Sequence, residues 1–102
     1  MNTQETYLRA ILATVARQTF TPQEIANHVL KNGGPKQVAA YNLCEGELTQ
    51  GDIAKEVGLD SGNFSKTIGR WVDVGIVIRI VNGKKIIPVH VYPLDKSFVK
   101  KG

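Results

Sequence analysis

The chain has 102 residues, of which 42% are hydrophobic and 22% are charged, and its formal net charge is +4. These values are typical of one soluble globular domain and exclude a disordered or collagen-like chain. The single cysteine, Cys44, excludes an intramolecular disulfide, and no positively charged segment precedes an apolar one near the N-terminus. The apolar runs are too short for a bilayer span, which needs ~20 helical residues. We therefore expect a cytoplasmic protein without a membrane anchor.

The positive charge is concentrated at the C-terminal end. Residues 76–102 hold six Lys/Arg and one Asp/Glu, a net charge of +5, whereas residues 46–75 have a net charge of −2. A basic patch of this kind provides an electrostatic footprint for nucleic acid. The alternative is a solvated lysine surface, and charge alone does not separate the two.

Two helices are expected in the first third of the chain. Apolar residues in 4–18 recur at helical spacing, which predicts an amphipathic helix. These residues are Leu8, Ile11, Leu12 and Val15. The next segment, Thr21-Pro22-Gln23-Glu24, is typical of a capping box at the start of a second helix. The Thr side chain can accept from the Glu amide, Pro is favoured at the first helical position, and the Glu carboxylate can accept from the Thr amide. The second helix turns Ile25, Val29 and Leu30 inward and ends at Asn32-Gly33-Gly34-Pro35.

Three further helices follow from similar signals. The first runs from about residue 35 to residue 44, with Val38, Ala39 and Leu43 expected in the core. Thr49 then caps a helix that extends to Val57, and Asp52 stands at the capping-box position. The segment Gly58-Leu59-Asp60 is expected to end this helix in a turn. Asp60 or Ser61 then caps the last helix, which ends at Gly75. The inward face of this last helix is predicted to carry Phe64, Ile68, Trp71 and Val72.

Two strand-like runs, 76–81 and 84–91, complete the pattern. Asn82-Gly83 between them predicts a hairpin with a type I′ turn, which needs a positive φ at both central residues. A helix, a tight turn, a second helix and a hairpin occur in this order in winged helix-turn-helix domains. We therefore predict a mainly α fold with a small antiparallel β wing, namely a winged helix-turn-helix with two extra N-terminal helices. The expected parts are an N-terminal helical extension (1–34), a winged-helix core (35–92) and a basic tail (93–102).

Two segments carry a resemblance to a known superfamily. Residues 48–60, LTQGDIAKEVGLD, resemble the second helix and turn of winged-helix transcription regulators of the MarR and ArsR kind. Residues 65–77, SKTIGRWVDVGIV, resemble their recognition helix and its exit into the wing. The resemblance covers about residues 36–91 and implies double-stranded DNA as the ligand.

The chain also departs from these regulators. The expected hairpin tip, Asn82-Gly83-Lys84-Lys85, lacks the Asp-x-Arg pair of MarR-type wings, and no long C-terminal helix follows it. The clustered Cys/His ligands of ArsR-type metal sites are absent from the sequence. A ligand-responsive or metal-responsive mechanism is therefore not implied by the resemblance.

The candidate DNA-binding residues lie on the last helix, the helix before it and the hairpin. Arg and Lys donate to guanine, Asn pairs with adenine, and hydroxyls and hairpin lysines reach phosphates. The last helix would enter the major groove, and the alternative for its polar face is simple solvation. For Arg79, pairing with Asp73 is the alternative, and for the hairpin lysines, protection of a strand edge. The candidates are Gln50, Ser61, Gly62, Asn63, Ser65, Lys66, Thr67, Arg70, Arg79, Lys84 and Lys85.

No catalytic or metal-binding motif is found. The sequence has neither a Gly-rich phosphate loop nor a nucleophile elbow, and Cys44, His28 and His90 lack the spacing of a ligand set. We expect no enzymatic activity and no cofactor. The leading hypothesis is a sequence-specific DNA-binding transcription regulator, homodimeric through its N-terminal helices. The alternative is a winged helix used for protein–protein interaction or assembly, which the acidic residues of helix 50–57 favour mildly.

Overall fold

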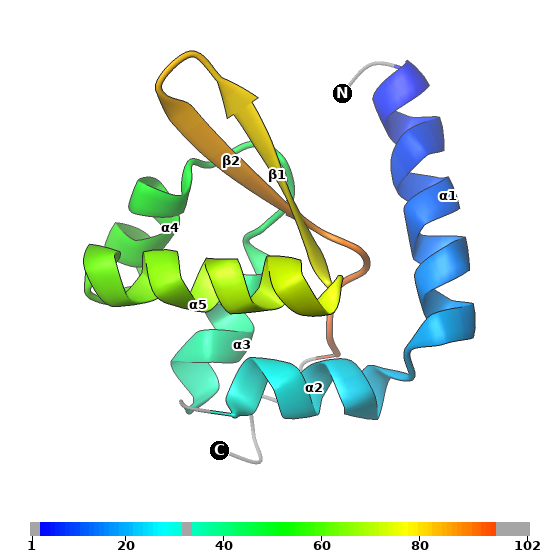
Figure 1. The fold of residues 1–102 in the computed structure, drawn as a ribbon, viewed down its shortest axis with the longest axis horizontal. Coiled ribbons are helices and arrows are strands. Elements are labelled where there is room, and N and C mark those ends of the chain that lie inside the picture. The colour runs from blue at the N-terminus through cyan, green and yellow to red at the C-terminus, as the bar shows by residue number, and fades with distance from the viewer. Residues whose placement is uncertain (1–2, 32–33, 96–102) are drawn as a thin grey trace.

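The computed structural model describes residues 3–31 and 34–95. In this part of the chain, five helices precede a two-stranded antiparallel hairpin. The helices are α1 (Thr3–Thr19), α2 (Pro22–Leu30), α3 (Pro35–Asn42), α4 (Gln50–Val57) and α5 (Ser61–Val74), and the strands are β1 (Val77–Asn82) and β2 (Lys85–His90). Helices α2–α5 gather under the hairpin, whereas α1 stands beside it (Figure 1). The prediction of a mainly helical chain with a small antiparallel sheet is confirmed.

Local hydrogen bonds fix the starts of three helices where the sequence predicts them. The Thr21 hydroxyl accepts from the Glu24 amide (3.2 Å), and the Glu24 carboxylate accepts from the Thr21 amide (2.9 Å), which completes the capping box. The Thr49 hydroxyl accepts from the Asp52 amide at the start of α4 (3.1 Å). The Asp60 carboxylate accepts from the Asn63 amide (2.9 Å), so Asp60 rather than Ser61 caps α5.

The ends of α4 and α5 depend on glycine. Gly58 follows α4 with φ of 80°, and Gly75 follows α5 with φ of 92°, both in the left-handed region that side chains disfavour. The tight turn at Gly58 brings α5 across α4, as the sequence predicts. Asn32 and Gly33, part of the expected end of the second helix, lie outside the described residues.

The core centres on aromatic side chains from α3 and α5. Trp71 is fully buried, with its ring 5.6 Å from that of Tyr41 and 5.9 Å from that of Phe64, both in edge-to-face arrangements. Ile68 is also buried, and Val72 packs against the core at its edge. The predicted inward face of α5 is therefore confirmed.

The expected core face of α3 was partly wrong. Val38 is buried and Leu43 packs against the core, but Ala39 is exposed. Val38 and Tyr41, three residues apart, set the inward face, and Ala39 is turned away from it by the helical rotation. The helix also ends at Asn42, before Cys44.

The hairpin turn differs from the predicted one by a single residue. Asn82 pairs with Lys85, so the two turn residues are Gly83 and Lys84 rather than Asn82 and Gly83. Only Gly83 has a positive φ (63°), the pattern of a type II′ rather than a type I′ turn. The observed register pairs Ile80 with Ile87, whereas the predicted turn would have placed Ile80 opposite Lys85. Cross-strand contact between two apolar side chains favours the observed register.

The segment after β2 belongs to the core. Val91, Tyr92 and Leu94 are buried, and the Asn42 side chain bonds both the amide (2.8 Å) and the carbonyl (3.0 Å) of Leu94. The buried Tyr41 hydroxyl donates to the Tyr92 carbonyl (2.7 Å). The expected tail, 93–102, thus contains Leu94, which packs into the domain. Its lysines, Lys96, Lys100 and Lys101, lie outside the described residues.

Candidate nucleic-acid interface

The outward face of α5 presents most of the residues predicted for it. Four of them are exposed, namely Ser61, Gly62, Asn63 and Lys66. Ser65 and Arg70 are half-buried beside them. The exposed group includes an amide, a hydroxyl and an ammonium, which match base edges and phosphates in hydrogen-bonding capacity.

Thr67, which the sequence analysis places on the outward polar face of α5, lies on its inward face instead. Only 8% of its surface is exposed, and its hydroxyl donates to the Asn63 carbonyl one turn earlier (3.1 Å). Thr67 lies three residues after Phe64 and four before Trp71, so it shares their inward face. Its hydroxyl is therefore directed to its own helix rather than to solvent.

Gln50 connects α4 with α5. Its side-chain amide donates to the Ser65 hydroxyl (3.2 Å), and its carbonyl oxygen is buried without a hydrogen-bond partner. Gln50 and Ser65 are both half-buried. This hydrogen bond from Gln50 to Ser65 therefore holds α5 against α4, and it leaves the two side chains less freedom to contact a ligand directly.

The hairpin tip lies next to the start of α4. Thr49, which caps α4, and Gln50 and Gly51 in its first turn line a hollow of about 290 Å³ together with Lys84 and Lys85. Both lysines are exposed. The first turn of a helix carries amide groups without internal partners and a partial positive charge, so this corner combines two features that favour an anion.

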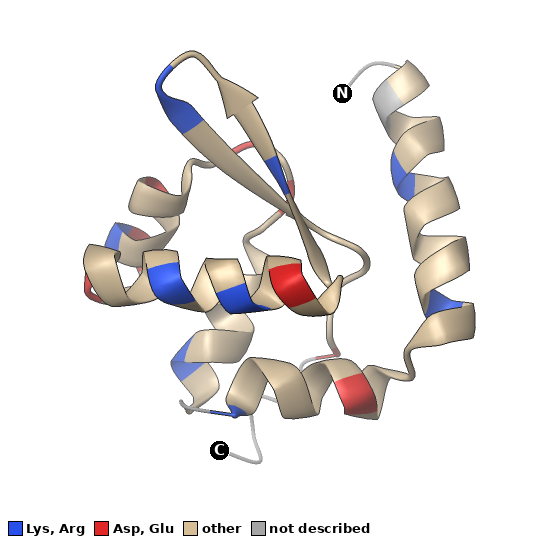
Figure 2. Ribbon diagram, in the orientation of Figure 1, with Lys and Arg blue, Asp and Glu red and all other residues tan. Residues whose placement is uncertain are grey.

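A second hollow of about 360 Å³ lies along α5. Its lining includes Asn63, Lys66 and Arg70 from α5, together with Asp60 and Gln37. The predicted cations therefore form two groups, one at the hairpin tip and one on α5. In the view of Figure 2, α4 lies between these groups and carries acidic as well as basic segments. The exposed acidic residues of α4 are Asp52 and Glu56.

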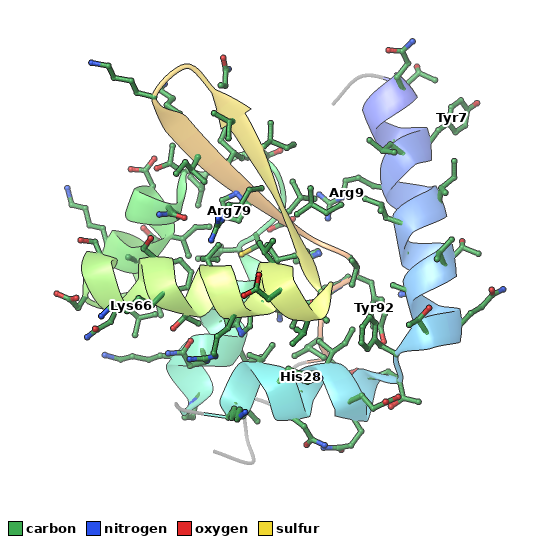
Figure 3. All side chains as sticks on the ribbon, in the orientation of Figure 1. Tyr7, Arg9, His28, Lys66, Arg79 and Tyr92 are labelled. Atoms are coloured by element: carbon green, nitrogen blue, oxygen red, sulfur yellow. The ribbon has the colours of Figure 1, made fainter. Side chains whose placement is uncertain are left out.

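Arg79 lies in the angle between the hairpin and α5 (Figure 3). Its guanidinium reaches over Gly69, where an added Cβ would stand 3.1 Å from Arg79 Nη2. A glycine at this place in α5 therefore makes room for the arginine. Arg79 is exposed and is brought close to the α5 surface, as the DNA-binding hypothesis requires.

The cysteine and the histidines do not form a site. Cys44 is fully buried, and burial raises the pKa of its thiol to about 12, so the reactive thiolate is disfavoured. His28 lies on α2 and His90 ends β2. Within residues 3–31 and 34–95, no group of three or more Cys, His, Asp or Glu side chains is arranged to hold a metal ion.

Sequence reasoning missed a contact between the N-terminal helix and the hairpin region. Arg9 of α1 donates to the Glu45 carbonyl, and its second terminal nitrogen lies 3.4 Å from His90 Nδ1. The partners are 36 and 81 residues apart in sequence, so no local pattern could have predicted them. Lys36 of α3 was also missed, and its ammonium lies 3.5 Å from the position of a Cβ added at Gly58.

Comparisons with known proteins do not assign the chain to a family. No family model, curated protein or solved structure matches it. In the described part of the chain, none of the helices combines the length and the apolar character needed to cross a membrane.

Proposed function

We propose that the chain is a winged helix-turn-helix protein that binds double-stranded DNA sequence-specifically and regulates transcription in the cytoplasm, without catalysing a reaction. In this proposal, α5 enters the major groove and the hairpin is the wing. The observation that carries it is the exposed group Ser61, Gly62, Asn63 and Lys66 at the start of α5. A short helix (α4), a tight glycine turn and this helix precede a hairpin with lysines at its tip.

The two groups of cations have different roles in this proposal. Lys84 and Lys85 beside the start of α4 would contact the phosphate backbone, with Arg79 nearer to α5. Asn63 and Lys66 would read base edges. Gln50 and Ser65 would fix the angle between α4 and α5 through their hydrogen bond. One helix covers only a few base pairs, so the proposal includes two copies of the chain on two half-sites.

A second candidate function is protein–protein interaction. It is favoured by the exposed Asp52 and Glu56 on α4 and by Asp60 in the hollow along α5. Carboxylates repel phosphates, and Asp60 lines the same hollow as Lys66 and Arg70.

The test compares phosphate-type and base-type substitutions. A duplex is first selected from a random pool, and binding to it and to a random duplex is then measured by fluorescence anisotropy at several salt concentrations. Lys85→Ala should weaken binding to both duplexes and reduce the salt slope by ~1, because one phosphate contact is lost. Asn63→Ala should instead reduce the preference for the selected duplex by ~1–3 kcal/mol.

A charge-matched control is Arg17→Ala. Arg17 is exposed in the last turn of α1, which stands apart from the hairpin tip and from the start of α5 (Figure 1), so this variant should retain the wild-type salt slope. If neither Lys85→Ala nor Asn63→Ala changes affinity for DNA, the proposed surface does not bind DNA, and protein–protein interaction replaces it as the function.

A further inference from the structure

Large apolar side chains are exposed mainly on two elements. Eight of them are more than a third exposed in the described part of the chain, and six of these lie on α1 or on one face of β1. The six are Tyr7, Leu8, Ile11, Val15, Ile78 and Ile80. Exposed apolar residues scattered singly are ordinary, but a contiguous patch marks an interaction surface.

Helix α1 is attached to the domain at a few points only. Arg9 bonds the Glu45 carbonyl and approaches His90, Arg17 stacks 4.6 Å from the centre of the Tyr92 ring, and Ala16 is buried. Arg9 points towards the hairpin, whereas Tyr7 points away from it (Figure 3). The helix therefore keeps most of its apolar surface outside the core.

A groove separates α1 from the hairpin. Its volume is about 290 Å³, and its apolar walls are Leu8 and Leu12 of α1 and Ile78, Ile80 and Val89 of the hairpin. Ile78 and Val89 are paired across the strands, and Ile80 follows on the same face. The groove is also lined by Arg9, Glu45 and Glu47, and the excess of carboxylates over cations disfavours a phosphate backbone there.

The apolar surface of α1 extends beyond the groove. Tyr7, Ile11 and Val15 are spaced by four residues and form a stripe next to Leu8 and Leu12. Tyr7, Ile11 and Val15 are 66%, 60% and 57% exposed. A helix that is apolar on its outer side as well as towards its own domain needs a partner on both sides.

We propose that a second copy of this chain covers the groove and the stripe, with the Tyr7–Ile11–Val15 stripe of each copy packed into the α1–β1 groove of the other. In a two-fold dimer the same patch meets itself, and the uncharged stripe of α1 matches the apolar walls of the groove. The six exposed side chains present on the order of 600 Å² per copy, close to the ~800 Å² that each partner gives to a standard interface.

A small molecule fits the observations less well. The groove is at the lower limit of the ~300–1,000 Å³ typical of ligand pockets, and a ligand inside it would leave Tyr7, Ile11 and Val15 in water. A second copy buries both parts of the surface at once. The interface deepens the two-copy part of the proposed function by naming its surface, and it forms without DNA, so the two proposals fail separately.

The test is sedimentation velocity without DNA, at protein concentrations from about 1 to 100 μM. The wild-type chain should sediment as a dimer at the higher concentrations. Ile11→Glu in the stripe, and Leu8→Glu or Ile80→Glu in the groove, should each raise the dimer dissociation constant at least tenfold. These side chains are 60%, 58% and 47% exposed, so circular dichroism should show an unchanged monomer fold.

The matched control is Val74→Glu, an exposed apolar position on α5 outside the patch, which should remain dimeric. The proposal is overturned by a monomeric wild type at 100 μM, by dimers that survive all three patch substitutions, or by equal dissociation of the control. It is also overturned if Ile11→Glu dissociates the dimer while both groove variants stay dimeric, because α1 then pairs without the hairpin. A monomer that still loses DNA preference on Asn63→Ala would retain the DNA proposal alone.

Discussion

His90 shows how burial changes the chemistry of a single residue. Its ring is 3% exposed, lies 5.3 Å from that of Tyr41, and has the Arg9 guanidinium at Nδ1. Burial, together with the positive charge of Arg9, lowers the pKa of His90 from 6.5 to about 4. The imidazole is therefore neutral in the folded chain at neutral pH, where it helps to join α1 to the end of β2.

This pKa predicts a loss of stability in mild acid. The unfolded chain binds a proton at His90 below about pH 6.5, whereas the folded chain does so only near pH 4. The contribution is therefore complete above pH 6.5 and is lost as the pH falls towards 4. Between pH 7 and 4.5 the free energy of unfolding should fall by ~2–3 kcal/mol from this residue.

Urea unfolding at the two pH values measures this loss. His90→Asn should show a pH dependence smaller by the same amount, and His28→Asn on α2 is measured beside it as a second histidine substitution, outside the contact with Arg9. An identical pH dependence of His90→Asn and wild type would show that His90 does not titrate with the predicted shift.

At the same scale, the predictable residues are those whose neighbours in sequence determine their environment. Phe64, Ile68 and Trp71 were placed correctly because helical spacing alone assigns them to one face. Thr67 was not, because a polar side chain was assumed to face solvent, although its position between Phe64 and Trp71 implies burial. The role of Gln50 in joining α4 to α5 depends on the crossing of two helices, which spacing does not specify.

At the scale of elements, the glycine inside α4 and the glycine that follows α5 have opposite effects on the free energy of unfolding. Gly75 has φ of 92°, where a side chain is strained, whereas Gly51 lies in the first turn of α4 with no close neighbour around an added Cβ. The helices themselves were predictable because caps and periodicity are local signals. The hairpin turn was displaced by one residue because its register depends on contacts between the strands, such as Ile80 with Ile87.

This contrast predicts opposite effects of the same substitution. Gly75→Ala should lower the free energy of unfolding by ~1–2 kcal/mol, because alanine resists the left-handed conformation. Gly51→Ala should raise it by up to ~1 kcal/mol, because glycine loses more conformational freedom when it becomes helical. Urea unfolding followed by circular dichroism measures both. Stabilisation by Gly75→Ala would contradict the assigned end of α5.

At the scale of the whole molecule, the last described residues pack against the end of α1 and against α3. The Tyr92 hydroxyl donates to the Phe20 carbonyl (2.9 Å), and the Tyr92 ring carries Arg17 of α1. Leu94 is held by Asn42 and is 5% exposed. The sequence could not predict this closure, because residues 91–95 show no helical period and the α1 and α3 partners of Tyr92 and Leu94 are at least 50 residues away along the chain.

This closure predicts that Leu94→Ala is strongly destabilising. Removal of a buried leucine side chain forfeits its transfer free energy and leaves a cavity, so the free energy of unfolding should fall by ~2–5 kcal/mol. The exposed neighbour Pro93 provides the control, since Pro93→Ala removes no core contact and should change stability by less than ~1 kcal/mol. Equilibrium urea unfolding at pH 7 compares both variants with the wild type. A loss below 1 kcal/mol for Leu94→Ala would mean that the basic tail begins at residue 93, as the sequence predicted, and that the segment from Val91 to Asp95 does not close the core.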